Sequence, residues 1–484
     1  MVEIEAVKKE GTAPETSKQA DVSPQAAKSY IENDLKDILD KYDTLYTTQD
    51  DDEQPYKSKY EGRELLLDAA KRLQAFCDAN SDQKDAENGP QERVAELTIL
   101  LARNYFWCEE TPTAEKKFME GLQLYMRNSD RRARNLKMCQ ATLNDLGILW
   151  MTRNMPETAI WFLRRAQVLY ETYCKHTEEA QRDKLIENNY SITTLHLATA
   201  YQTHGNGISS AMYCAETLAR HLAFNKNDKA TEFDRDFDRR EWVRSCATLA
   251  EFFFTRCDFA TGEYCITAAD VLAQELADQP DIPRDWGELQ TAIQKHYCNY
   301  FLNRLKKSYD FTSEREEFDA HLKWILEPKA APKNLEKSLR SEKRLEFHDN
   351  LHEQIEWDEY HPLEVELEDE SDGSEKLLSR VGATTIDVGN GITCDINIHF
   401  PQLHDRVVAK IQARNKNFFA AGEKAIGGGK FCMLATKFET ARELFKSGNS
   451  LGQEVLKAFP LNGHVTDHLN CLFDVVQLWN ALQS

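Results

Sequence analysis

The stretch Leu146-Gly147-Ile148-Leu149-Trp150, followed by Ala159, Leu163 and Ala166, decides the fold of this chain. It places a small residue directly after a leucine and an aromatic residue four positions after it, and then small or apolar residues 13, 17 and 20 positions on. Small residues at fixed helical spacing let two helices approach closely. The stretch therefore predicts a helix, a turn and a second helix packed against the first.

The same line occurs in three further copies. They are Leu101, Ala102, Tyr105, Ala114, Phe118 and Gly121; Leu197, Ala198, Tyr201, Ser210, Cys214 and Thr217; and Leu249, Ala250, Phe253, Gly262, Ile266 and Ala269. This is the line of a tetratricopeptide repeat, TPR. The leucines are 45, 51 and 52 residues apart, whereas the usual period is about 34, so each unit has longer helices or longer connections. We expect an all-α fold, a right-handed solenoid of such pairs, whose concave face holds other proteins.

The repeat anchors are predicted to be structural. Bulky side chains at these positions fill the space between the two helices of a unit, and a role in binding a ligand is the minor alternative for the aromatic ones. The anchors are Leu101, Tyr105, Leu146, Gly147, Trp150, Leu197, Tyr201, Leu249 and Phe253. Polar residues on the first helices that stand outside the line, such as His196, Thr199, Arg244 and Thr248, are either solvated or face a partner.

The chain divides by composition into four parts. Residues 1–24 lack aromatic side chains and are predicted to be disordered. Residues 25–310 form a helical array with repeats near 92–125, 137–173, 188–222 and 240–276. Residues 311–435 are predicted to be a linker region with some helix, because they hold the acidic run 356–375 and several glycines. Residues 436–484 begin a second helical array.

The net charge limits the kinds of partner that the chain can bind. The 484 residues carry 81 acidic and 60 basic side chains, a formal net charge of −21. Nucleic acids and anionic membrane surfaces are disfavoured, because both require a basic footprint. A basic protein partner would complement the negative net charge. An equally open alternative is that the acidity only keeps the chain soluble.

Cysteine usage and hydropathy indicate a cytoplasmic protein. The twelve cysteines form no CxxC pair and several lie on apolar helix faces, which is typical of a reducing compartment. The first 22 residues contain no apolar signal region, and no apolar run is long enough to span a membrane. We therefore expect no direct membrane insertion.

Two candidate chemical motifs were weighed and rejected. Residues 427–430, Gly-Gly-Gly-Lys, resemble a phosphate loop, but Phe431 replaces the required hydroxyl residue and no buried strand precedes them. His348 and His352 are four residues apart on a predicted helix, yet the sequence between them is not that of a metalloprotease. We predict no catalytic residues, no bound metal and no cofactor.

Five ordered motifs resemble those of the KIF-binding protein family, a kinesin-binding TPR family. They cover about residues 55–305 and 436–475, whereas residues 380–430 match the family poorly. The motifs are residues 54–60 (QPYKSKY), 144–150 (NDLGILW), the pairs Tyr201-Gln202 and Tyr213-Cys214, 438–445 (FETARELF) and 462–468 (NGHVTDH).

The resemblance implies a function. Members of the family bind kinesin motor domains, prevent most of them from engaging microtubules, and support microtubule organisation, organelle transport and axon outgrowth during neuronal differentiation. It implies a cytoplasmic, cytoskeleton-associated protein. The family's motor-contacting positions, on its inner helices, correspond to His196, Thr199, His221 and Thr248, of which only Thr248 keeps the family's residue type. The family also continues beyond the point that matches Trp479, which predicts a chain truncated relative to it.

Two other functions remain as alternatives. A general TPR adaptor or co-chaperone would bind the carboxylate of a peptide tail, which requires clustered Lys, Arg and Asn on the inner helices. Of the inner positions considered, only Arg244 provides such a charge. An enzyme on a TPR scaffold would have to place its site within residues 330–430, where His348 and His352 lie.

Overall fold

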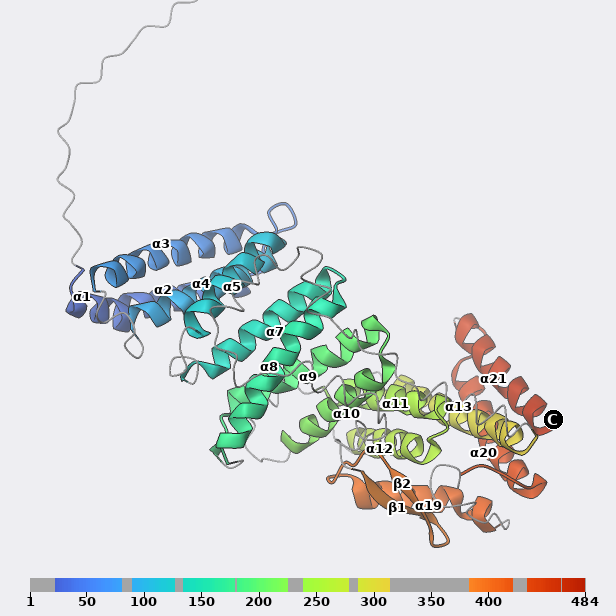
Figure 1. Cartoon of the computed structure of the whole chain (residues 1–484). Helices are drawn as coiled ribbons and strands as arrows, with labels where there is room; N and C mark the ends of the chain where they lie inside the picture. The colour runs from blue at the N-terminus through green and yellow to red at the C-terminus, as the bar shows by residue number, and fades with distance from the viewer. Residues whose placement is uncertain are drawn as a thin grey trace, which may run out of the picture. The chain divides into compact units, whose positions relative to one another are not determined.

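A computed structural model describes residues 22–80, 89–126, 134–178, 181–224, 238–277, 286–313, 383–420, 433–462 and 464–483 (Figure 1). The chain divides into two compact units, Met1–Asn135 and Leu136–Ser484. Several sequence predictions fall outside the described residues: the N-terminal segment up to residue 21, the acidic run 356–375, His348, His352 and residues 427–430.

The first unit consists of helices. In chain order they are α1 (Pro24–Ser29), the π-helical turn η1 (Tyr30–Asp34), α2 (Leu35–Thr47), α3 (Lys57–Ala79), α4 (Pro90–Trp107) and α5 (Thr111–Met126). Tyr30 and Phe76 meet in its core with ring centroids 5.8 Å apart. Tyr42 of α2 is also buried, directly over Gly62 of α3, where a Cβ atom would lie 3.1 Å from the ring.

The second unit is also mostly helical. Its elements are α7 (Leu136–Thr152), α8 (Pro156–His176), α9 (Lys184–His204), α10 (Gly207–Phe224), α11 (Arg239–Thr255), α12 (Phe259–Ala277), α13 (Trp286–Ser313), β1 (Thr384–Gly389), β2 (Ile392–Ile396), α19 (His404–Ala420), α20 (Phe438–Ala458) and α21 (Val465–Gln483). The prediction of a helical repeat fold is confirmed, since consecutive helices pack in pairs: α4 with α5, α7 with α8, α9 with α10 and α11 with α12.

One turn geometry recurs between the two helices of all four pairs. Eight residues after each repeat leucine the backbone takes a left-handed conformation, with φ between 57° and 88°. These residues are Glu109, Asn154, Gly205 and Cys257. Since only glycine and asparagine adopt this conformation readily, Glu109 and Cys257 are held there by the surrounding turn.

The aromatic anchor closes that turn through its backbone. Its carbonyl accepts a hydrogen bond from the amide five residues on, at 2.9–3.0 Å in every pair. The bonds run from Glu110 to Tyr105, Met155 to Trp150, Asn206 to Tyr201 and Asp258 to Phe253. Because each turn spans only a few residues, the unusual repeat spacing arises from long helices and from the connections between pairs.

The small residues of the repeat line stand where the two helices touch. A Cβ atom on Gly147 would lie 2.6 Å from Leu163, and one on Gly262 would lie 2.4 Å from Phe254. Real contacts are never this short, so any larger residue would force the two helices apart. The repeat leucines and Trp150, Tyr201 and Phe253 are buried, whereas Tyr105 is half-buried under the guanidinium of Arg63.

The described part of the region 311–435 is folded rather than a linker. Strands β1 and β2 form an antiparallel hairpin, with Ile386 opposite Cys394. Their buried side chains join the core formed by α11, α12 and α13, and α19 packs on α12. The hairpin also means that the fold is not purely helical. Cys394 is disulfide-bonded, an exception to the predicted pattern of free thiols, while ten other cysteines are free.

A buried polar cluster fixes α19 to α12 and α13. Glu263 of α12, only 1% exposed, accepts hydrogen bonds from Tyr300 (2.7 Å) and Asn415 (2.8 Å). It also forms an ion pair with Arg414 of α19 at 3.2 Å. Arg304 of α13 donates to Tyr300 and to Asn415 at 2.7 and 3.2 Å. Sequence patterns did not reveal the contacts of Arg414 and Asn415 with Glu263 and Arg304, since these join residues more than 100 positions apart.

Candidate partner-binding surface

Helix α9 presents one of the two candidate faces. It begins at the cap Asp183, whose carboxylate accepts a hydrogen bond from the Leu185 amide at 2.8 Å, and it ends at Gly205, whose φ is 88°. Its buried side packs on α8 and α10. The opposite side leaves Leu195 and Thr199 exposed and His196 half-buried. Both termini are therefore fixed, which makes α9 a rigid carrier for these three side chains.

Helix α11 presents the second face. Its cap is Asp238, which accepts a hydrogen bond from the Arg240 amide at 2.9 Å. Trp242, Cys246 and Leu249 are buried, while Arg244 and Thr248 are exposed. Helix α10 packs against both α9 and α11, so the two faces belong to neighbouring helix pairs.

Three of the four predicted contact residues lie on first helices. Thr199 and Thr248 are exposed, and His196 is half-buried beside Thr199 on α9. The hydroxyl of Thr199 donates to the Leu195 carbonyl at 3.2 Å, so it is held against its own helix. His221 differs from the expectation, because it lies on α10, the second helix of its pair. The α9–α10 connection ends at Gly207, which puts position 221 on the second helix.

The two predicted histidines are uncharged near neutral pH. Burial lowers the pKa of His196 below its ordinary value of 6.5. Burial also lowers the pKa of His221, and the neighbouring Arg220 guanidinium lowers it further. A neutral imidazole donates or accepts a hydrogen bond but provides no charge for a partner.

The charges on these faces are of both signs. Helices α9 and α11 together carry four basic residues, Lys184, Arg239, Arg240 and Arg244, and three acidic residues, Glu187, Glu241 and Glu251. Glu251 lies 2.9 Å from His296 of α13, and this hydrogen bond lowers the pKa of Glu251. The acidity of the chain is thus not concentrated on these helices.

Leu195 was missed by the sequence analysis. Its side chain is 47% exposed, one turn before Thr199 on the same side of α9. A leucine two positions before the repeat leucine at 197 is as compatible with a buried position as with a surface position, so only the direction of the side chain distinguishes the two. It adds an apolar contact to an otherwise polar face.

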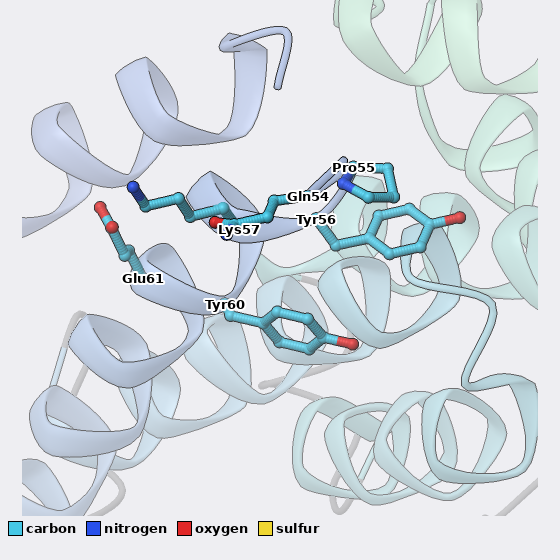
Figure 2. Close-up of a pocket in the computed structure, with 6 residues that line it drawn as sticks. All are labelled: Gln54, Pro55, Tyr56, Lys57, Tyr60 and Glu61. Carbon is cyan, nitrogen blue, oxygen red and sulfur yellow. The ribbon is translucent and has the colours of Figure 1, made fainter. Parts of the chain in front are cut away.

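A separate hollow of about 430 Å³ lies in the first unit (Figure 2). It is lined by Gln54, Pro55, Tyr56, Lys57, Tyr60 and Glu61. The rings of Tyr56 and Tyr60 lie edge to face with centroids 6.5 Å apart and point the same way, whereas Lys57 and Glu61 point away from them. Arg63 covers the Tyr60 ring at 4.8 Å. This is the QPYKSKY segment that carried the first family resemblance.

The described residues contain no cluster of three or more metal-ligating side chains, and none of their helices is long and apolar enough to cross a membrane. What the geometry provides is a scaffold of paired helices whose exposed first-helix sides carry mixed polar and apolar groups. Helical repeats in general offer such exposed sides as binding surfaces.

Comparison with known proteins identifies the family. The family model described as "KIF-1 binding protein C terminal" matches residues 240–484. The human KIF-binding protein is 24% identical over 476 residues, which cover 89% of this chain and 65% of the human protein. The zebrafish (Danio rerio) protein is 24% identical, covering 90% and 66%, and the Dictyostelium discoideum protein is 21% identical over 55% of this chain.

A solved structure agrees with the fold. A cryo-EM structure of KIFBP matches with a TM-score of 0.50 at 19% identity, covering 93% of this chain and 64% of that one. The chain belongs to the KIF-binding protein family, and it spans about 65% of the length of the human relative.

Proposed function

We propose that this chain is a non-catalytic kinesin-binding regulator, which holds a kinesin motor domain on the exposed sides of α9 and α11 and thereby limits its engagement with microtubules. The observation that carries the proposal is family membership over residues 240–484, a range that includes all of α11 except its first residue. Its relatives are KIF-binding proteins by name. Microtubule organisation, organelle transport and axon outgrowth would follow from motor control in the cytoplasm.

The face has the composition of a protein interface. Leu195 supplies an exposed apolar side chain, Thr199 and Thr248 supply hydroxyl groups, and Arg244 supplies a charge. Interfaces combine an apolar centre with a polar rim, and arginine is enriched in them. Because the charges of α9 and α11 nearly balance, we expect only a moderate loss of affinity at higher salt.

The peptide-tail adaptor has less support. A carboxylate clamp needs cations directed at the ligand. On α11, Arg240 forms an ion pair with Asp238 at 3.1 Å, and Arg244 lies 3.8 Å from Glu241. These acidic neighbours reduce the attraction of the two arginines for the free carboxylate of a peptide.

The test is microtubule co-sedimentation of a panel of kinesin motor domains with and without the purified chain. We expect the chain to lower the pelleted fraction of at least one motor. The paired substitutions Leu195→Glu and Thr248→Arg should restore pelleting, because a charge and a bulky group are then placed on the contact face. Leu185→Glu is the matched control, since Leu185 is 52% exposed on the same helix but about 15 Å away along it. Unchanged pelleting of every motor at saturating protein would contradict the proposal.

A further inference from the structure

The hollow of the first unit lies beside two tyrosines that are not packed in its core. Tyr56 and Tyr60 stand four residues apart at the start of α3, and their rings point the same way (Figure 2). Tyr60 is 47% exposed. The hollow, of about 430 Å³, has the size of a small binding pocket. Open aromatic rings beside such a hollow indicate a site for a group that packs on ring faces.

Hydrogen bonds hold the segment before α3 in place. The Asp50 carboxylate accepts hydrogen bonds from the Ser58 amide at 3.1 Å and from the Ser58 hydroxyl at 2.7 Å. The same carboxylate lies 3.9 Å from the ammonium of Lys59. The Gln54 amide donates to the Asp51 carbonyl at 2.9 Å, which closes a turn. Because the hollow is formed in advance, a ligand does not have to order it on binding.

An arginine of the chain itself shows which group these rings bind. The Arg63 guanidinium lies 4.8 Å from the ring centroid of Tyr60 and 3.9 Å from that of Tyr105. It also forms an ion pair with Glu110 at 2.8 Å. A guanidinium over tyrosine rings is favourable, because the cation meets the negative ring faces while its N–H groups donate to the carboxylate.

The hollow offers the same groups but holds no arginine of its own. Glu109 directly precedes Glu110 in the α4–α5 turn and is exposed. Desolvation and the nearby Glu109 carboxylate raise the pKa of the Tyr56 hydroxyl, so the two side chains are neighbours. In the part of the chain that the structure describes, no lysine or arginine forms an ion pair with Glu109. The ring and the carboxylate are therefore open to a cation from another molecule.

The backbone of Glu109 supports a binding role. Its φ is 63°, in the left-handed region that glutamate rarely adopts. In two of the other three pairs the equivalent residues are Asn154 and Gly205, which suit this conformation. Residues held in an unfavourable conformation are concentrated at functional sites. The glutamate lowers the stability of the turn, and it places a carboxylate at the hollow.

The charge around the hollow is negative. Residues 50–63 and 109–110 contain seven acidic and three basic side chains. Lys59 and Arg63 are paired with carboxylates of the same unit, and Lys57 points away from the two rings (Figure 2). Exposed carboxylates stand in the turn just before the hollow, at Asp51, Asp52 and Glu53. This surface attracts a cationic group and repels an anionic one.

We propose that the hollow beside Tyr56 and Tyr60 receives an arginine side chain from an exposed basic segment of a partner protein. The guanidinium packs on the tyrosine rings and donates to the Glu109 carboxylate. Basic neighbours in the same segment lie against the carboxylates of residues 51–53. Arginine fits better than lysine, because its planar group both stacks on a ring and donates to a carboxylate as a fork. The site uses other residues than α9 and α11, and it goes beyond the regulatory function proposed above.

The test is fluorescence anisotropy with the purified full chain and a labelled peptide of glycine and serine that carries a central arginine between two lysines. We expect a dissociation constant on the order of 100 μM at low salt, and weaker binding as salt is added. Lysine in place of the central arginine should weaken binding a few-fold, and glutamine should weaken it at least about tenfold. No binding of the arginine peptide, or equal binding of the glutamine peptide, would overturn the proposal.

Variants of the chain place the peptide in the hollow. Tyr60→Ala should weaken binding of the arginine peptide at least about tenfold. Trp107→Ala is the matched control, since Trp107 is 57% exposed in the same unit but does not line the hollow, and it should bind as the parent does. Equal losses in these two variants would contradict a specific site.

Glu109→Asn distinguishes a binding role of this residue from a structural one. Asparagine suits the left-handed turn but lacks the charge, so the peptide should bind at least about threefold more weakly while the melting temperature of the chain stays the same or rises. Full affinity in this variant would overturn the role of the carboxylate in the proposal. A lower melting temperature would show that the glutamate serves the turn instead.

Discussion

The interiors of the helix pairs and their exposed sides follow different rules. Inside, the repeat leucine, the small residue and the aromatic anchor recur in all four pairs, and the aromatic carbonyl closes the same turn in each. At the unrepeated positions the pairs differ: the residue just before the repeat leucine is Leu100, Asp145, His196 or Thr248, of which only Thr248 is exposed. The repeated positions therefore determine the fold, and the unrepeated positions are where a partner can be selected.

The largest expected loss of stability comes from disrupting the packed interior. Glu263→Ala removes a buried carboxylate that is bonded to Tyr300, Asn415 and Arg414, and it leaves the Arg414 guanidinium with only the more distant carboxylate of Asp270, at 4.0 Å. Breaking a buried ion pair in this way typically costs about 3–5 kcal/mol. The free energy of unfolding measured in urea should fall by this amount. A shift below about 1 kcal/mol would mean that the cluster does not hold α19 in place.

A smaller effect is expected where two helices touch. Gly262→Ala places a methyl group 2.4 Å from the Phe254 ring and 3.1 Å from the Ala250 carbonyl, which should destabilise the chain by about 1–3 kcal/mol. Gly287→Ala is the matched control, since no atom lies within 4 Å of its Cβ position in helix α13. Thermal unfolding of both variants measures the difference. The control Gly287→Ala should leave the stability of the chain unchanged or raise it slightly. Equal losses in both variants would contradict close packing at Gly262.

The mildest effect involves pH. Burial lowers the pKa of His196 and of His221 below 6.5, so the unfolded chain binds more protons than the folded chain as the pH falls below that value. The stability that comes from keeping these rings neutral is complete above about pH 6.5 and is lost as the pH falls through the lowered pKa values. The double variant His196→Gln with His221→Gln should lose less of its melting temperature between neutral and mildly acid pH. An identical pH profile would exclude a contribution of these two groups.

The sequence predicted the interior much better than the exterior. The repeat line located both helices of each pair, because close approach requires small residues at fixed positions. It did not reveal the left-handed turn residues Glu109 and Cys257, since neither residue type favours that conformation. The hairpin at 384–396 was also missed, because its pairing to the repeats depends on contacts such as Asn397 with Asp258 that are distant in sequence.

The candidate surface was predicted only in part. Helical position places Thr199 and Thr248 on the exposed sides of first helices, whereas His221 lies on a second helix, four residues after the repeat position Thr217. The exposure of Leu195 and the balance of charge on α9 and α11 depend on side-chain direction and neighbouring helices. Net charge alone could not reveal either of them.

The most direct test of the central claim measures binding and stability in the same variants. Affinity for a kinesin motor domain that the chain removes from microtubules should fall at least about tenfold for Leu195→Glu with Thr248→Arg, while the free energy of unfolding stays within about 0.5 kcal/mol of the parent. Gly262→Ala should show the reverse, a lower midpoint with near-unchanged affinity of the folded fraction. Full affinity in the face variant would contradict the claim that the unrepeated positions of α9 and α11 bind the partner.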